Sequence, residues 1–220
     1  KKFIIVTTIA MLTLVGKAYA EMTYGWSLAL TKIDATGSET EGKGTGEVTN
    51  GDADNLVVIP SIFAEYGYSD TISIGLDYIP LEADVSDKTK SRGDTETSVS
   101  GTATEVTTAR TNKVQATLKN HLTLYANYNL TDSTYVKVGA AMVTLNTDDS
   151  LGTGSKYPNE DIYGGVIGLG MQEGSHRFEL VYTDYEDITL TSSVARADVT
   201  NNNKIEAELD TLAFKYAYAF

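Results

Sequence analysis

The sequence predicts an all-β fold, an eight-stranded antiparallel up-and-down transmembrane β-barrel. Three observations predict this fold. Eight segments alternate apolar residues with small or polar ones at a period of two. The connections between these segments are alternately short and long. The segment that closes the sequence carries an aromatic ring at every second position from Phe214 to Phe220.

The eight predicted strands are joined by tight turns on one side and by long polar stretches on the other. Transmembrane barrels have short periplasmic turns and long external loops. The tight turns are expected at 68–70, 130–133 and 173–175. The external loops are expected at about 33–54, 82–112, 146–160 and 189–204. The strands are expected at 22–32, 55–68, 71–81, 113–129, 134–145, 161–172, 176–188 and 205–220.

The beginning of the sequence has the pattern of an export signal. Lys1 and Lys2 precede an apolar stretch, and Ala18-Tyr19-Ala20 supplies the small residues that a signal peptidase requires. The alternative is an N-terminal membrane anchor, but the apolar stretch is short for a membrane helix. We therefore expect a cleaved signal peptide at 1–20 and a barrel domain at 21–220.

The charge of the chain excludes one class of partner. Its net charge is −13, and removal of residues 1–20 would lower the basic count from 17 to 14 against 30 acidic residues, giving −16. Nucleic acid requires basic residues to neutralise its phosphates, so no nucleic-acid partner is expected. The sequence contains no cysteine, and we expect no cofactor.

Aromatic residues gather near both ends of the predicted strands, on their apolar faces. Amphipathic rings suit the headgroup zone of a bilayer, where spanning barrels carry two aromatic girdles. This pattern favours a membrane barrel over a secreted lipocalin-like barrel, which would turn its apolar faces inward. The predicted girdle residues are Trp26, Tyr66, Tyr68, Tyr78, Tyr128, Tyr163, Phe178 and Tyr182.

The opposite strand faces carry small residues and a set of ionisable ones. An eight-stranded barrel has an interior that side chains nearly fill, so buried charges there must pair. We predict a lumen charge network that closes the barrel as a polar plug, with a gated conduction path as the alternative. Its predicted members are Glu65, Asp77, Lys119, His121, Lys137, Arg177, Glu179 and Lys215.

The chain from residue 21 onward resembles the eight-stranded outer-membrane barrel superfamily, which includes the OmpA transmembrane domain and the opacity, Ail and OmpX-type surface proteins. The resemblance rests on the signal peptide, the opening Tyr24-Gly25-Trp26, the alternation of turns and loops, and the closing aromatic run. It implies a multi-pass protein of the Gram-negative outer membrane, in contact with lipid and lipopolysaccharide. It also implies that the barrel-assembly machinery recognises Phe214, Tyr216, Tyr218 and Phe220 as an assembly signal.

We expect a monomeric, non-enzymatic protein that serves envelope structure and surface interaction, with an extracellular protein or a phage as partner. A narrow porin-like channel for small solutes is the alternative function, and a lipid-modifying enzyme is a further one. Catalysis is disfavoured because His121 shares a lumen face with Thr123 and His176 lies beside Ser175 in a turn. No metal is expected, since the acidic pairs of the loops lack the ligand spacing of a calcium loop.

Overall fold

The computed structural model describes residues 22–40, 48–85, 90–99, 105–150, 156–193 and 203–220. The predicted signal peptide at 1–20 lies outside the described residues. The strands are β1 (Met22–Thr40), β2 (Val48–Gly67), β3 (Ile72–Ile79), β4 (Ala83–Asp84), β5 (Lys90–Val99), β6 (Glu105–Asn129), β7 (Thr134–Ser150), β8 (Glu160–Glu173), β9 (His176–Tyr185), β10 (Ile188–Thr191) and β11 (Lys204–Ala219). No helix within the described ranges has the length and apolar character needed to cross a membrane.

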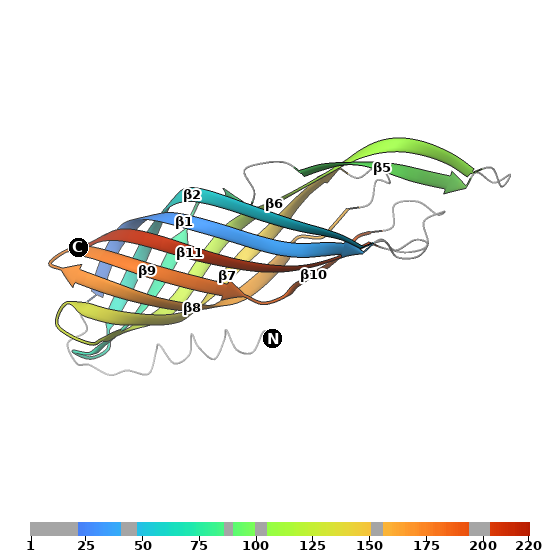
Figure 1. The fold of residues 1–220 in the computed structure, drawn as a ribbon. Coiled ribbons are helices and arrows are strands. Elements are labelled where there is room, and N and C mark those ends of the chain that lie inside the picture. Colours follow the sequence, from blue (N-terminus) through green and yellow to red (C-terminus); the bar gives the residue numbers. More distant parts are fainter. Residues whose placement is uncertain (1–21, 41–47, 86–89, 100–104, 151–155, 194–202) are drawn as a thin grey trace.

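Eight of these strands close into an antiparallel barrel in the order β1-β2-β3-β6-β7-β8-β9-β11, as the sequence predicted. The barrel closes because β11 pairs with β1, from Gly25 opposite Ala219 to Thr40 opposite Lys204. β4 and β10 are short strands that pair with β6 and β11, and β5 pairs with the first part of β6. β5 and this part of β6 form a ribbon that extends beyond the barrel body (Figure 1).

Tight turns lie at the end of the barrel where the chain ends (Figure 1). The β8–β9 turn contains Gly174 with φ of +57°, a backbone conformation that glycine adopts without steric cost. The β2–β3 turn is held by two amide donors on the Ile72 carbonyl, and the β6–β7 turn by two on the Thr134 carbonyl. We call this end of the barrel the turn end and the opposite end the loop end.

The outer surface of the barrel is apolar and the inner surface holds its charges. Leu28, Leu56, Ile167 and Leu180 are between 46 and 62% exposed, whereas Glu65, Arg177 and Glu179 are buried. From Leu56 to Tyr66 of β2, about ten residues at ~3.3 Å each, tilted by ~40°, span about 25 Å. This is the height of the apolar band of an outer-membrane barrel, so the surface suits a bilayer.

The strands run further toward the loop end than the sequence predicted. β1 and β2 pair through Thr40 and Val48, within the segment 33–54 that was expected to be a loop. The segment 82–112 holds β4, β5 and the start of β6; β7 continues into the segment 146–160, and β10 lies at the start of 189–204. The prediction was wrong here because polar strands above a membrane need no apolar outer face, so their composition resembles that of loops.

The predicted inward face of Lys119 is also corrected. Leu118 is buried inside the barrel, whereas Lys119 is partly exposed and pairs with Glu82 at 3.0 Å. The β6–β7 register shifts between Lys119 and Leu122, and Asn120 has a φ of 53°. This β-bulge adds one residue to β6 and therefore exchanges the faces of the residues before it.

Four aspartates stand side by side across neighbouring strands just beyond the apolar band. The register places Asp34 of β1 opposite Asp54 of β2 and Asp210 of β11, and Asp210 opposite Asp184 of β9. Lys32, whose Nζ lies 2.7 Å from Asp34 Oδ1, offsets part of this charge. Partial burial, together with Asp34 and Asp184, raises the pKa of Asp210 above its ordinary value. Like charges directly opposite each other destabilise a sheet.

The substitution Asp34→Asn should therefore stabilise the barrel at neutral pH, by about 0.2 to 1 kcal/mol. Because the pKa of Asp210 is raised in the folded protein, its negative charge destabilises the fold at pH values above that pKa. This destabilisation disappears as the pH falls through the pKa and Asp210 takes up a proton. The advantage of the Asp34→Asn variant over wild type should thus shrink as the pH is lowered. Guanidinium unfolding in lipid vesicles, followed by the fluorescence of the single tryptophan, Trp26, measures both effects. A variant less stable than wild type at pH 7 would contradict the repulsion.

Candidate functional site in the barrel interior

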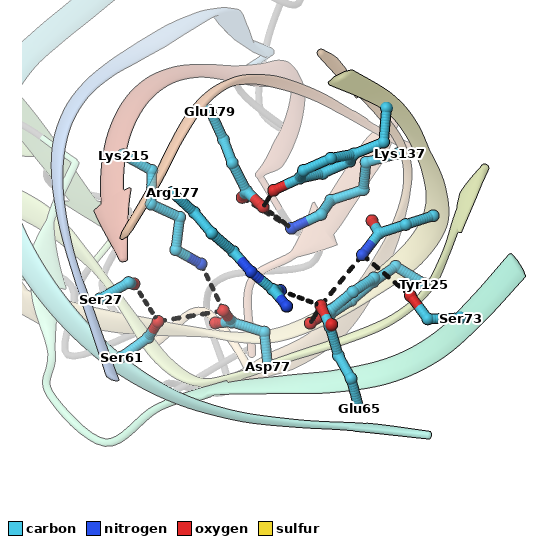
Figure 2. A network of polar contacts seen from close by, with 12 residues as sticks. Ser27, Ser61, Glu65, Ser73, Asp77, Tyr125, Lys137, Arg177, Glu179 and Lys215 are labelled. Atoms are coloured by element: carbon cyan, nitrogen blue, oxygen red, sulfur yellow. Dashed lines mark hydrogen bonds and ion pairs between the residues drawn. The ribbon is translucent and has the colours of Figure 1, made fainter. Parts of the chain in front are cut away.

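Six ionisable side chains fill the interior toward the turn end and form what we call the charge plug: Glu65, Asp77, Lys137, Arg177, Glu179 and Lys215 (Figure 2). Lys137 Nζ donates to both carboxylate oxygens of Glu179, at 2.7 and 2.6 Å. Arg177 Nη1 donates to Glu65 Oε1 at 2.7 Å, and Lys215 donates to Asp77. Three acids thus meet three bases, so the interior carries no net charge at this level.

Each pair of the charge plug joins strands that are not neighbours in the sheet. Arg177 of β9 reaches Glu65 of β2, and Lys215 of β11 reaches Asp77 of β3. The pairs therefore connect opposite parts of the barrel wall across the lumen. Buried pairs of this kind cost desolvation and contribute to stability only when their remaining lone pairs are also satisfied.

Hydroxyl and amide groups donate further hydrogen bonds to the buried carboxylates. Tyr125 and Asn127 donate to Glu65 Oε1 at 2.8 and 3.0 Å, and Tyr135 donates to Glu179 Oε1 at 2.5 Å. Ser61 donates to Asp77 Oδ2 at 3.1 Å (Figure 2). Sequence reasoning did not include these polar residues, although Tyr125 and Asn127 share the alternation that places Thr123 on the lumen face.

Glycines make room for the aromatic rings of this layer. A Cβ on Gly75 would collide with the Tyr125 ring, and one on Gly170 would collide with the Tyr135 ring. Lys137 Nζ lies 4.2 Å from the centroid of the Tyr125 ring, at cation–π distance. The glycines of β3 and β8 therefore position the tyrosines that hold the carboxylates.

Above the charge plug, the interior is apolar, which the sequence analysis did not predict. A buried cluster extends toward the loop end and includes Ile33, Leu118, Val143, Ile162 and Leu209. Between this cluster and the plug lies a cavity of about 100 Å³, which we call the chamber. Its lining includes Ala29, Ile59, Ile79, Leu81, Val166 and Val181, with Asp77, Lys137 and Lys215 at the side of the plug.

The wall beside the chamber contains an interruption of the strand pairing. β2 and β3 pair from Gly67 opposite Ser73 to Ile62 opposite Tyr78, and β3 ends at Ile79. Beyond that point β2 continues to Val48 paired with β1, and a hydrogen bond from Asn55 Nδ2 to the Asp84 carbonyl at 2.8 Å crosses the interruption. We call this interruption the seam.

Residues on both sides of the seam line the chamber. Ile59 of β2 and Leu81, which follows β3, both line the chamber from the two sides of the seam. Leu81 is also 53% exposed. Pro60 and Pro80 flank these residues, and proline has no amide hydrogen to donate to a ladder. The strand pairing is thus interrupted where two prolines leave the backbone without amide donors.

Residues 156–159, which precede β8, pack at the loop end of the apolar cluster. Tyr157 is buried in the apolar cluster, and its hydroxyl donates to Glu39 Oε1 at 2.7 Å. Asn203 Nδ2 donates to the same oxygen at 3.1 Å, and the amide of Ser193 donates to the carbonyl of Lys156. We call this segment, with Tyr157 as its inserted ring, the cap.

At the turn end, the plug faces a second and polar cavity. This cavity measures about 500 Å³ and is lined by Glu65, Tyr68, Asn127 and Arg177, among others. The charge plug therefore separates a polar space at the turn end from the apolar chamber above it.

His121 lies in the wall of the chamber rather than in the charge plug. Its Nε2 lies 2.9 Å from the Tyr185 hydroxyl, and the two rings meet edge to face. Its Nδ1 is buried and has no hydrogen-bond partner among the described residues. Of the eight residues predicted for the lumen network, the structure brings six together in the plug, places His121 above them and turns Lys119 outward.

The predicted girdle and assembly-signal residues lie on the outer face. Trp26, Tyr68, Tyr78, Tyr128, Tyr163, Phe178 and Tyr182 are exposed, and Tyr66 is partly so. Phe214 of β11 and Phe220, which follows this strand, are exposed, while Tyr216 and Tyr218 pack against Trp26 of β1 at the barrel closure. His176 Nδ1 lies 2.8 Å from the Tyr216 hydroxyl.

Neither histidine contacts a serine, threonine or carboxylate in the hydrogen bonds of the described residues, since their partners are Tyr185 and Tyr216. Across the described ranges, His, Asp and Glu side chains form no group of three that could hold a metal ion.

Removing one partner of a buried pair should destabilise the barrel more than removing both. Lys137→Met leaves the buried Glu179 carboxylate unpaired and should lower the free energy of unfolding by about 3 to 5 kcal/mol. Adding Glu179→Gln removes that charge while keeping an acceptor for Tyr135, so it should restore most of the loss. Chemical unfolding in vesicles and the gel shift of the heated protein measure the effect. Equal stability of the single and double variants would contradict the pairing.

Neither a protein-family model nor a curated protein sequence matches the chain. Several solved structures are similar to the chain. The outer membrane protein OprG from Pseudomonas aeruginosa is 12% identical, with a TM-score of 0.50 over 89% of this chain and 96% of OprG. The outer membrane protein AlkL is 14% identical, with a TM-score of 0.50 over 94% of this chain and 93% of AlkL. Ail of Yersinia pestis is 13% identical at a TM-score of 0.35, over 89% of this chain and 99% of Ail. The chain therefore shares the β-barrel fold of the outer membrane proteins OprG and AlkL.

Proposed function

We propose that this protein resides in the outer membrane of a Gram-negative bacterium and receives small apolar molecules in its chamber, through the seam. The single observation that carries the proposal is the position of Leu81, which lines an interior apolar cavity and is half exposed on the outer surface. Ligand sites are typically apolar cavities with a few polar groups, and the chamber has this composition.

The residues at both ends of the interior support the lateral route. The ion pairs of the charge plug lie toward the turn end, and the cap places the buried ring of Tyr157 in the apolar cluster toward the loop end. An apolar molecule dissolved in the bilayer would meet the seam without crossing either barrier. A continuous aqueous path for ions is disfavoured for the same reason, so we propose passage of apolar solutes rather than porin-like conduction.

Surface interaction is a second candidate function, and the ribbon of β5 and β6 favours it. Among the described strands, β5 pairs with β6 alone, so the backbone groups along its other edge, from Lys90 to Val99, have no strand partner. An extended segment of an extracellular protein adds readily to such an edge. We propose no catalysis, because each histidine is paired with a tyrosine rather than with a nucleophile.

Filling the chamber should abolish binding of a small apolar probe. Toluene added to the protein in lipid nanodiscs should shift the methyl resonances of Ile59 and Ile79, which line the chamber. Ala29→Phe places a ring in the chamber and should weaken binding by at least about tenfold, or ~1.4 kcal/mol. Ala140→Phe, on the outer face, is the matched control, and Ile167 reports toluene in the lipid. Unchanged binding by Ala29→Phe would refute the chamber as the site.

Blocking the seam should slow entry without removing the chamber. The chain has no cysteine, so Leu81→Cys introduces a single thiol that a bulky maleimide can modify. The modified protein should show slower exchange of toluene, measured from the line shapes of the Ile79 methyl signals. The matched control is Leu130→Cys, modified in the same way in the β6–β7 turn, where Leu130 is exposed. Equal exchange rates in the two modified proteins would exclude the seam as the route.

A further inference from the structure

We infer that the chamber selects apolar molecules that carry one hydroxyl group, which forms a hydrogen bond with His121. This inference rests on the proposed function, because it names the class of molecule that the same chamber takes. Three observations support it. They are the β-bulge in β6, the ring nitrogen of His121 that has no hydrogen-bond partner among the described residues, and the ion pairing of the charged side chains that line the chamber.

The bulge gives the chamber its apolar character and leaves His121 in its wall. Lys119 pairs with Thr144 and Leu122 with Met142, so Asn120 and His121 together face the single residue Val143. An unbroken alternation that keeps His121 inward would also bring Lys119 inward and Leu118 outward. The bulge instead turns Leu118 into the chamber and Lys119 out to Glu82. It therefore removes a charge from the chamber without removing the imidazole.

This arrangement requires an unfavourable backbone conformation. Asn120 adopts a left-handed φ of 53°, and it is the one residue other than glycine with a positive φ in the described part of the chain. Backbone outliers of this kind persist where the surrounding structure enforces them, often beside functional sites. Bulges likewise serve to redirect side chains next to such sites. The backbone geometry at Asn120 thus indicates that the fold specifically directs His121 into the wall of the chamber.

The imidazole offers one unused hydrogen-bonding position. Nε2 is occupied by Tyr185 at 2.9 Å, whereas Nδ1 has no partner among the described residues. If Nε2 donates to the tyrosine oxygen, Nδ1 accepts; if the tyrosine donates, Nδ1 carries the hydrogen and donates. A hydroxyl group satisfies either tautomer because it both donates and accepts. A carbonyl or ether group satisfies only one.

A charged ligand has no counterpart in the chamber. Of the ionised residues that line it, Asp77 is paired with Lys215 and accepts from Ser61, and Lys137 is paired with Glu179. A carboxylate or ammonium group would therefore be buried without a free partner, at a large desolvation cost. The volume of about 100 Å³ is smaller than the roughly 150 Å³ of a cavity that holds benzene, so a ring enters the chamber only when the side chains that line it shift outward.

Phenol and toluene are a matched pair of probes, because one carries a hydroxyl where the other carries a methyl group. The protein in nanodiscs, labelled with ¹⁵N in its two histidines, reports the contact directly. Phenol should shift the Nδ1 resonance of His121 and leave that of His176 unchanged, since His176 lies on the outer face with its Nδ1 beside Tyr216. Toluene should leave both Nδ1 resonances near their positions in the free protein.

Substitution supplies the affinity test. His121→Phe should weaken phenol binding by about threefold to tenfold more than it weakens toluene binding, as expected for the loss of one hydrogen bond. Should His121→Phe fail to fold, as judged by the gel shift on heating, the ¹⁵N measurement on the unsubstituted protein decides. Tyr185→Phe, which keeps Nδ1 available, should retain the phenol-induced shift.

The outcomes separate the two proposals. Binding of toluene to the chamber with no phenol-induced shift at His121 Nδ1 would overturn the selection for a hydroxyl and leave the proposed function intact. Equal losses of toluene and phenol binding in His121→Phe would assign the residue a packing role and overturn the inference in the same way. Absence of binding by both probes would overturn the proposed function together with the inference.

Discussion

The pairing of β11 with β1 is the constraint on which the rest of the structure depends. Backbone groups facing hydrocarbon have no water to bind, so a sheet in a bilayer must close on itself. Closure with eight strands leaves an interior that side chains nearly fill. Every inward residue therefore meets others across the lumen, and the chemistry of the protein is decided by which residues point inward at each level.

The two levels of the interior perform different physical tasks. The charge plug joins non-neighbouring strands through ion pairs whose geometry is specific. Ionic pairs are weak contributors to stability but discriminate well against a shifted register, because a one-residue slip would turn them toward lipid. The apolar level above has less directional packing, so it tolerates a cavity and an interruption in the wall.

The period-two alternation was sufficient to predict the fold and the inward direction of the residues that form the plug. It failed at Lys119 because the alternation of inward and outward side chains can be extrapolated along a strand only as far as a β-bulge. Asn120 was the signal of this bulge, since asparagine adopts a left-handed φ more readily than most residues. The chamber was not predictable in the same way. Its residues come from many strands, and whether their side chains leave a cavity depends on packing that alternation does not encode.

The charge plug also explains where the seam begins. The last paired residues of β2 and β3 are Ile62 and Tyr78, and Ser61 and Asp77 lie next to them, joined by a hydrogen bond of 3.1 Å inside the barrel. Asp77 is held in turn by Lys215 of β11. The two strands are thus tied to each other and to the far wall at the point where their ladder ends. Above that point the described pairings include no ladder between β2 and β3, so the seam begins where the hydrogen bonds and ion pairs of the plug end.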